Sequence, residues 1–122
     1  MNDLNLFKKN GFLVKENLIS QTKINKINKI VNEVILKEKK KKNGNGANGT
    51  QSYDNYHFVY NSGSSKNKEI LRLNNPQNRH KIFYELSRDK KIISIAKKLL
   101  GGTVRFHLGK LNFKLPNKKK GS

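Results

Sequence analysis

The chain has 122 residues, enough for one domain, and its 34% hydrophobic and 8% aromatic residues predict a small core. It contains no cysteine, which excludes disulfides, thiolate metal sites and cysteine nucleophiles. Its 27 Lys and Arg against 8 Asp and Glu give a formal net charge of +19, so self-repulsion must be tolerated, screened or neutralised by a polyanion.

The basic residues are almost all lysines. Only Arg72, Arg79, Arg88 and Arg105 are arginines. Nucleic-acid readers favour Arg, which makes bidentate contacts to guanine and phosphate, whereas abundant Lys, Asn and Ile are typical of AT-rich coding. The lysine runs near residues 37–42 and 118–120 therefore predict weak, unspecific polyanion binding.

The apolar runs are far too short to span a bilayer. The N-terminus lacks the basic and then apolar layout of a signal peptide. We therefore expect a cytoplasmic protein that makes no membrane contact.

The first forty residues predict a helix, a short strand and a longer helix. Leu4 to Asn10 reads as a short helix that ends at Gly11, and residues 12–16 follow as a strand. Ser20 can cap the longer helix. Apolar side chains recur along that helix at helical spacing: Ile24, Ile27, Val31, Val34 and Ile35.

Residues 39–52, rich in Lys, Gly and Asn, predict a flexible loop. Strands are expected over 53–60 and 70–75, the second ended by Pro76, which has no N–H for a sheet ladder. The order of elements indicates a single α+β domain.

Two helices and a strand are expected in the last part of the chain. One helix includes Phe83, and Asp89 can cap another that stops at Gly101. The final strand is expected over 103–114.

The alternation of that final strand suggests an anion site. Val104, Phe106 and Leu108 would face a core, and Lys110, Asn112 and Lys114 would continue the same face toward its mouth. A buried ammonium there would need an anionic partner, such as a small carboxylate. Two alternatives stay open: the strand simply emerges from the core, or its register buries Leu111 and Phe113 instead.

Three stretches resemble the phytanoyl-CoA dioxygenase family. Phe7 to Ser20 looks like the family's opening, which places a Phe, a Gly and a Leu/Ile pair before a capped helix. The Leu73-Asn-Asn-Pro76 turn, the paired helices and the Leu100-Gly-Gly102 stop are similar to its middle. Lys110 to Pro116 looks like its Leu-Asn-x-Lys-Pro-Pro strand, with Leu115 in place of the first proline. The stretches follow the family's order along nearly the whole chain.

The resemblance implies a non-haem Fe(II), 2-oxoglutarate-dependent oxygenase that hydroxylates a small organic substrate and converts 2-oxoglutarate to succinate. Such enzymes are built on a double-stranded β-helix, a jelly-roll or cupin-like barrel with helices packed outside. Residues 1–122 would form a single partial domain: the N-terminal helices and first strands of an incomplete barrel.

The resemblance also implies the residues that bind the co-substrate. Lys114 matches a lysine that contacts a 2-oxoglutarate carboxylate, and Asn112 matches the polar position beside it. Lys110 and Arg72 match positions near the co-substrate pocket. No catalytic residue is predicted in this chain.

The iron ligands of the family are not found in the sequence. The family holds iron with a His-x-Asp pair and a second histidine, and the pair follows the lysine that matches Lys114. None of His57, His80 and His107 begins a His-x-Asp or His-x-Glu pair. We therefore expect the chain to be inactive alone, either as a truncation or as one part of an enzyme that a second chain completes.

Two other functions are compatible with the sequence. The net charge suggests a small basic nucleic-acid-binding protein. An incomplete barrel would also leave a sheet edge and an apolar inner face unpaired, which predicts self-association or a β-edge interaction protein.

Overall fold

The computed structural model describes residues 1–40, 53–61 and 69–114. Their elements, in chain order, are α1 (Asp3–Asn10), α2 (Gln21–Lys39), β1 (His57–Tyr60), β2 (Ile70–Asn74), the 3-10 helix η1 (Pro76–Asn78), α3 (Lys81–Ser87), α4 (Lys90–Leu100) and β3 (Lys110–Asn112). The strands form one antiparallel sheet in the order β1-β2-β3. The predicted α+β class is confirmed. Most of the loop expected over 39–52 lies outside the described residues.

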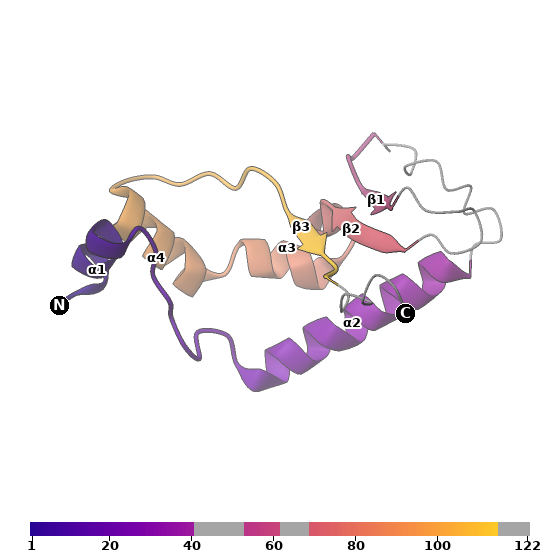
Figure 1. The fold of residues 1–122 in the computed structure, drawn as a ribbon, viewed down its shortest axis with the longest axis horizontal. Coiled ribbons are helices and arrows are strands. Elements are labelled where there is room, and N and C mark those ends of the chain that lie inside the picture. The colour runs from indigo at the N-terminus through magenta and orange to yellow at the C-terminus, as the bar shows by residue number, and fades with distance from the viewer. Residues whose placement is uncertain (41–52, 62–68, 115–122) are drawn as a thin grey trace, which may run out of the picture.

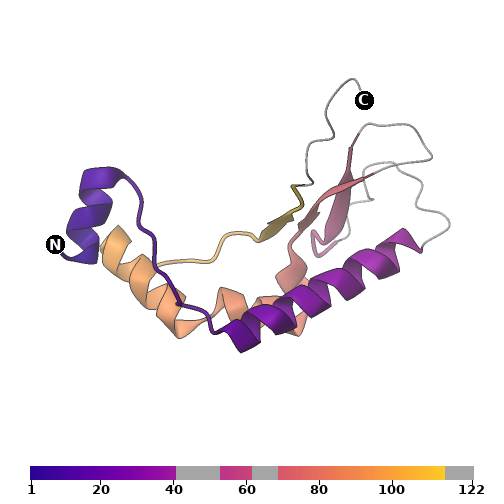
Figure 2. The ribbon, with the colours of Figure 1, turned by 60° about the horizontal axis from the view of Figure 1, so that its bottom comes forward.

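The molecule is elongated, with two helices packed together at one end and the sheet at the other (Figures 1 and 2). At one end α1 lies against α4, and at the other the sheet stands over the C-terminal half of α2 (Figures 1 and 2). An extended segment joins α4 to β3 along the length of the molecule (Figure 2). No helix in the part of the chain that the structure describes is long and apolar enough to cross a membrane.

The helix boundaries follow local capping chemistry. The Ser20 hydroxyl accepts a hydrogen bond from the backbone N–H of Lys23, and the Asp89 carboxylate accepts from the N–H groups of Lys91 and Ile92. Gly11 and Gly101 end α1 and α4 in the left-handed conformation, each with φ of 78°. All four of these predicted boundaries are confirmed.

The strand expected over 12–16 is wrong. These residues form an irregular segment, and the side chains of Phe12 and Val14 are 63% and 70% exposed. Strand backbone is stabilised by a neighbouring strand, and within the described ranges no strand pairs with this segment. Its short apolar run therefore does not become a strand.

The main core lies between the sheet and α2. Phe58 from β1 and Ile70 and Leu73 from β2 are buried, and Leu73 is fully inaccessible. Val34 and Ile35 of α2 pack against them. Only the C-terminal end of the apolar stripe predicted for α2 thus packs on one face of the sheet.

The last strand is shorter than expected, and its register is the alternative that buries Leu111 and Phe113. Only Lys110–Asn112 pairs with β2, and Leu111 lies opposite Leu73. Leu111 and Phe113 pack on the core. Phe106 and Leu108 are 49% and 43% exposed, so a core position for these two side chains is wrong, whereas Val104 is half-buried.

β3 is short because its partner strand β2 ends at Asn74. Asn75 adopts the left-handed conformation, with φ of 52°, and Pro76 begins η1. The backbone of β2 therefore turns away after Asn74, and residues 103–109 have no continuing strand to pair with.

Asn75 also ties β3 to this turn. Its backbone N–H donates to the Gly109 carbonyl at 2.8 Å, and its side-chain Oδ1 accepts from the Gly109 N–H at 3.3 Å and from Gln77 Nε2 at 3.1 Å. Its Nδ2 donates to the Asn55 carbonyl at 3.1 Å. One side chain therefore joins the segment before β1, η1 and the start of β3.

Asn75→Ala should destabilise the protein by about 2 to 3 kcal/mol, because it removes the three side-chain hydrogen bonds and places alanine in a left-handed conformation. Asn75→Gly should cost about 1 kcal/mol less, because glycine adopts that conformation freely. Urea denaturation followed by circular dichroism measures both changes. Equal losses for the two variants would show that the backbone conformation of Asn75 carries no cost.

Candidate functional site

The two faces of the sheet have opposite chemistry. Phe58, Leu73 and Leu111 lie opposite one another and face α2. The alternate positions form the other face, which we call the polar face. It consists of two cross-strand rows: His57, Asn74 and Lys110, and Val59, Arg72 and Asn112.

The polar face corrects one expectation. An incomplete barrel was expected to expose an apolar inner face, but Val59 is the one apolar residue of the six. None of the described helices covers this face, and α2 lies on the opposite side of the sheet (Figure 2). Lys110 and Asn112 are exposed on it. It is suited to bind a polar ligand rather than an apolar partner.

Arg72 occupies the centre of the polar face. It lies on the middle strand, opposite Asn112 of β3 and Val59 of β1. Its Nε is buried and has no hydrogen-bond partner among residues 1–40, 53–61 and 69–114. A buried charged donor without an acceptor is unfavourable, so an anion that reached this guanidinium would be stabilised.

The predicted co-substrate residues come together in large part. Lys110 lies opposite Asn74 on β3, and Asn112 lies opposite Arg72. Lys114 is exposed and lies two residues beyond β3, outside the paired part of the sheet. The polar face carries Arg72 and Lys110 but no Asp or Glu, so its own residues leave two cations uncompensated.

Asn74 is the functional candidate that the sequence did not reveal. It is 9% exposed, its Nδ2 donates to His57 Nε2 at 2.8 Å, and its Oδ1 is buried without a described partner. The sequence places it within the Asn-Asn-Pro turn. Its position two residues after Arg72 on a strand was the signal that puts both side chains on one face.

A second polar cluster holds the segment before β1 against η1 and α3. Arg79 binds Asp54 through Nε and Nη2, at 2.8 and 3.2 Å, and its guanidinium lies 4.3 Å from the centre of the Tyr56 ring. The Tyr56 hydroxyl is 2.9 Å from His80 Nε2. Burial raises the pKa of Tyr56. Burial also lowers the pKa of His80, and the charges of Arg79 and Lys37 lower it further.

The donor set does not fit an iron site. Within the described ranges, no three His, Cys, Asp or Glu side chains are grouped so that they could hold a metal ion. His57 bonds to Asn74 and to the Asn55 carbonyl, and His80 bonds to Tyr56. His107 lies in the extended segment before β3.

Comparison with family models, with curated proteins and with solved structures found no match to this chain.

The depressed pKa of His80 predicts a pH-dependent stability. The unfolded chain binds this proton more readily, so the contribution of neutral His80 is complete above the ordinary histidine pKa and is lost as the pH falls below it. The Tm should therefore fall as the pH is lowered from about 7.5 to about 5.5.

His80→Gln should flatten this dependence, because glutamine can still accept the Tyr56 hydrogen bond but does not titrate. His107→Gln is the matched control and should keep the wild-type slope, because His107 is exposed and outside the cluster. Thermal melts across the pH range measure both. An unchanged slope in His80→Gln would contradict the assignment.

Proposed function

We propose that this chain is the N-terminal part of an oxygenase similar to the phytanoyl-CoA dioxygenases, and that its polar face binds a carboxylate of 2-oxoglutarate. The observation that carries the proposal is the position of Arg72. Arg72 lies on the middle strand of a face without carboxylates, opposite Asn112, and its Nε is buried without a described partner. The motif resemblance, reached from the sequence, points to the same residues.

The donors on this face match the chemistry of a dicarboxylate. A guanidinium can bind one carboxylate with two parallel N–H donors, and the Asn112 amide can donate a further hydrogen bond. Lys110 on the neighbouring row adds a mobile positive charge. These residues would bind and orient the co-substrate, and the side of the sheet that faces α2 would keep the strand rigid.

We propose no iron-binding role for these residues, because the described side chains include no group of three that could hold a metal ion. The proposal assigns the metal ligands to protein beyond this sequence. It follows that the chain would bind the co-substrate but would not hydroxylate a substrate without that remainder.

Titration with 2-oxoglutarate at constant ionic strength tests the binding site. The four arginines give four Nε–H resonances in a ¹H–¹⁵N spectrum, and that of Arg72 should shift on binding. Arg72→Gln should weaken binding about tenfold, because it removes a charge-assisted pair of hydrogen bonds. Asn112→Ala, at an exposed position that does not support the core, should weaken it about threefold.

The control for general charge attraction is a pair of variants with the same chemical change. Lys110→Gln removes a cation from the polar face, and Lys97→Gln removes one from an exposed position of α4. Both variants lower the net charge by one, so both should weaken 2-oxoglutarate binding slightly, and Lys110→Gln should weaken it more than Lys97→Gln. Equal losses, or an Arg72 resonance that does not move, would refute the site.

The resemblance makes a separate prediction at the level of the gene. A His-x-Asp pair should be encoded within about a dozen codons after Ser122, in this or another reading frame, because the facial triad needs it. Sequencing of the downstream region provides the measurement. An intact gene that encodes no such pair would remove the oxygenase assignment while leaving the anion site open to test.

A further inference from the structure

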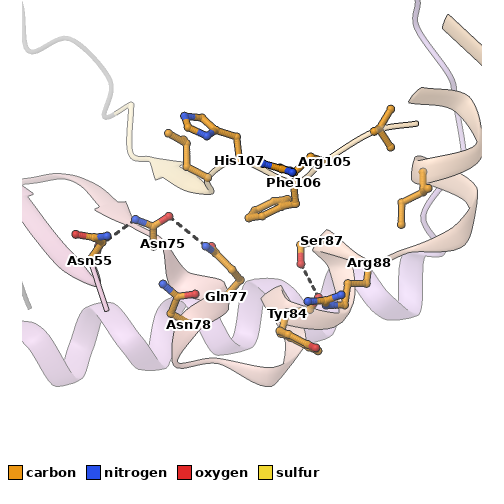
Figure 3. A pocket seen from close by; sticks show the side chains of 13 residues that line it. Asn55, Asn75, Gln77, Asn78, Tyr84, Ser87, Arg88, Arg105, Phe106 and His107 are labelled. Carbon is orange, nitrogen blue, oxygen red and sulfur yellow. Dashed lines mark hydrogen bonds between the residues drawn. The ribbon is translucent and has the colours of Figure 1, made fainter. Parts of the chain in front are cut away.

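A pocket of about 680 Å³ shares no residue with the polar face. One wall is the extended segment that precedes β3, and the other is formed by α3 and the start of α4 (Figure 3). The amides of Asn75 and Gln77 stand at one end. Its volume is in the range of small-molecule sites.

The charged groups of the pocket are both arginines. Arg88 comes from the end of α3 and Arg105 from the extended wall, and no Asp or Glu is among the described residues that line it. Neither arginine has a carboxylate partner within residues 1–40, 53–61 and 69–114. The chain has only four arginines among 27 basic residues, and two of them line this pocket. Arginine differs from lysine in its planar group with several donors, so the pair indicates a ligand that is recognised by its shape as well as by its charge.

The pocket also presents aromatic surface. The Phe106 ring is directed from the extended wall toward α3, although its side chain is 49% exposed (Figure 3). On the opposite wall, the Arg88 guanidinium lies 4.4 Å from the centre of the Tyr84 ring, which supports it as a flat donor group. A flat ring between the walls could stack on Phe106 while an attached anion reaches the arginines.

One end of the pocket is fixed before any ligand binds. Asn75 bonds to Gly109 of the extended wall through both its backbone and its side chain, and Gln77 donates to the same Asn75 oxygen. A Cβ atom at Gly109 would lie 2.5 Å from Gln77 Oε1, so the extended segment and η1 approach closely at this end. This end of the pocket is therefore preformed, which lowers the entropic cost of binding.

We propose that this pocket binds a nucleoside monophosphate unit. The base stacks on Phe106, and the phosphate accepts hydrogen bonds from Arg88 and Arg105. The unit can be a free nucleotide or one residue of a single strand, since both offer the same ring and phosphate. This inference does not depend on the 2-oxoglutarate proposal.

Binding of AMP to the wild-type chain, measured by calorimetry at constant ionic strength, tests the site, with adenosine and inorganic phosphate as partial probes. AMP should bind at least tenfold more tightly than either part. Phe106→Leu should weaken AMP about tenfold by removing the stacking surface, and Arg105→Lys should weaken it about fivefold by removing the planar donors.

Lys97→Gln is the control, because this exposed lysine of α4 is not part of the pocket lining. It should change AMP affinity less than twofold. Phe106→Leu should keep the wild-type melting temperature within a few degrees, because an exposed ring contributes little to the core. Asn112→Ala, on the polar face, should leave AMP affinity unchanged, which separates this site from the one proposed for 2-oxoglutarate.

Competition with an eight-residue oligoadenylate distinguishes the two sources of the ligand. If the oligonucleotide displaces AMP, the pocket accepts a nucleotide within a strand, and if it does not, the pocket takes the free nucleotide. Inorganic phosphate that binds as tightly as AMP, or AMP affinity that is the same in Phe106→Leu as in the wild type, would overturn the proposal.

Discussion

The attachment of β3 depends on one asparagine. β3 pairs with β2 over only three residues, and the double hydrogen bond between Asn75 and Gly109 fixes the point at which the pairing starts. A slip by one residue would move Lys110 and Asn112 to the α2 side and expose Leu111. Asn75 therefore decides which side chains reach the polar face, and it also holds one end of the pocket beside α3.

The few carboxylates of the chain leave both proposed sites without an acidic residue of their own. Of the eight acidic residues, five make structural contacts: Asp3 with Lys15, Asp54 with Arg79, Glu85 with Lys81, Glu38 with Tyr60, and Asp89 as a helix cap. The polar face receives none of them, and the described lining of the pocket contains none. Since the net charge is +19, each bound anion would also relieve self-repulsion in the folded chain.

Local features of the fold were predictable, and features that need a distant partner were not. The caps at Ser20 and Asp89 depend on hydrogen bonds that span two or three residues, so the sequence contains the whole interaction. The expected strand over 12–16 and the first part of the strand expected over 103–114 did not form, because a strand needs a neighbour. The left-handed turn at Asn75 ends β2 before residues 103–109 could pair with it. The choice between the two registers of the last strand likewise required the position of Leu73.

The same division applies to the candidate site. Residues on different strands cannot be brought together by periodicity, and only the motif resemblance linked Arg72 with Lys110 and Asn112. The cross-strand register then placed these three on one face and added Asn74, because residues directly opposite in an antiparallel sheet share a face. Lys114 lies beyond the ladder, so no pairing fixes its side chain there. The proposed anion site therefore depends on Arg72 and Asn112, whose backbone positions the strand pairing fixes, and Lys110 and Lys114 would supply charge around them.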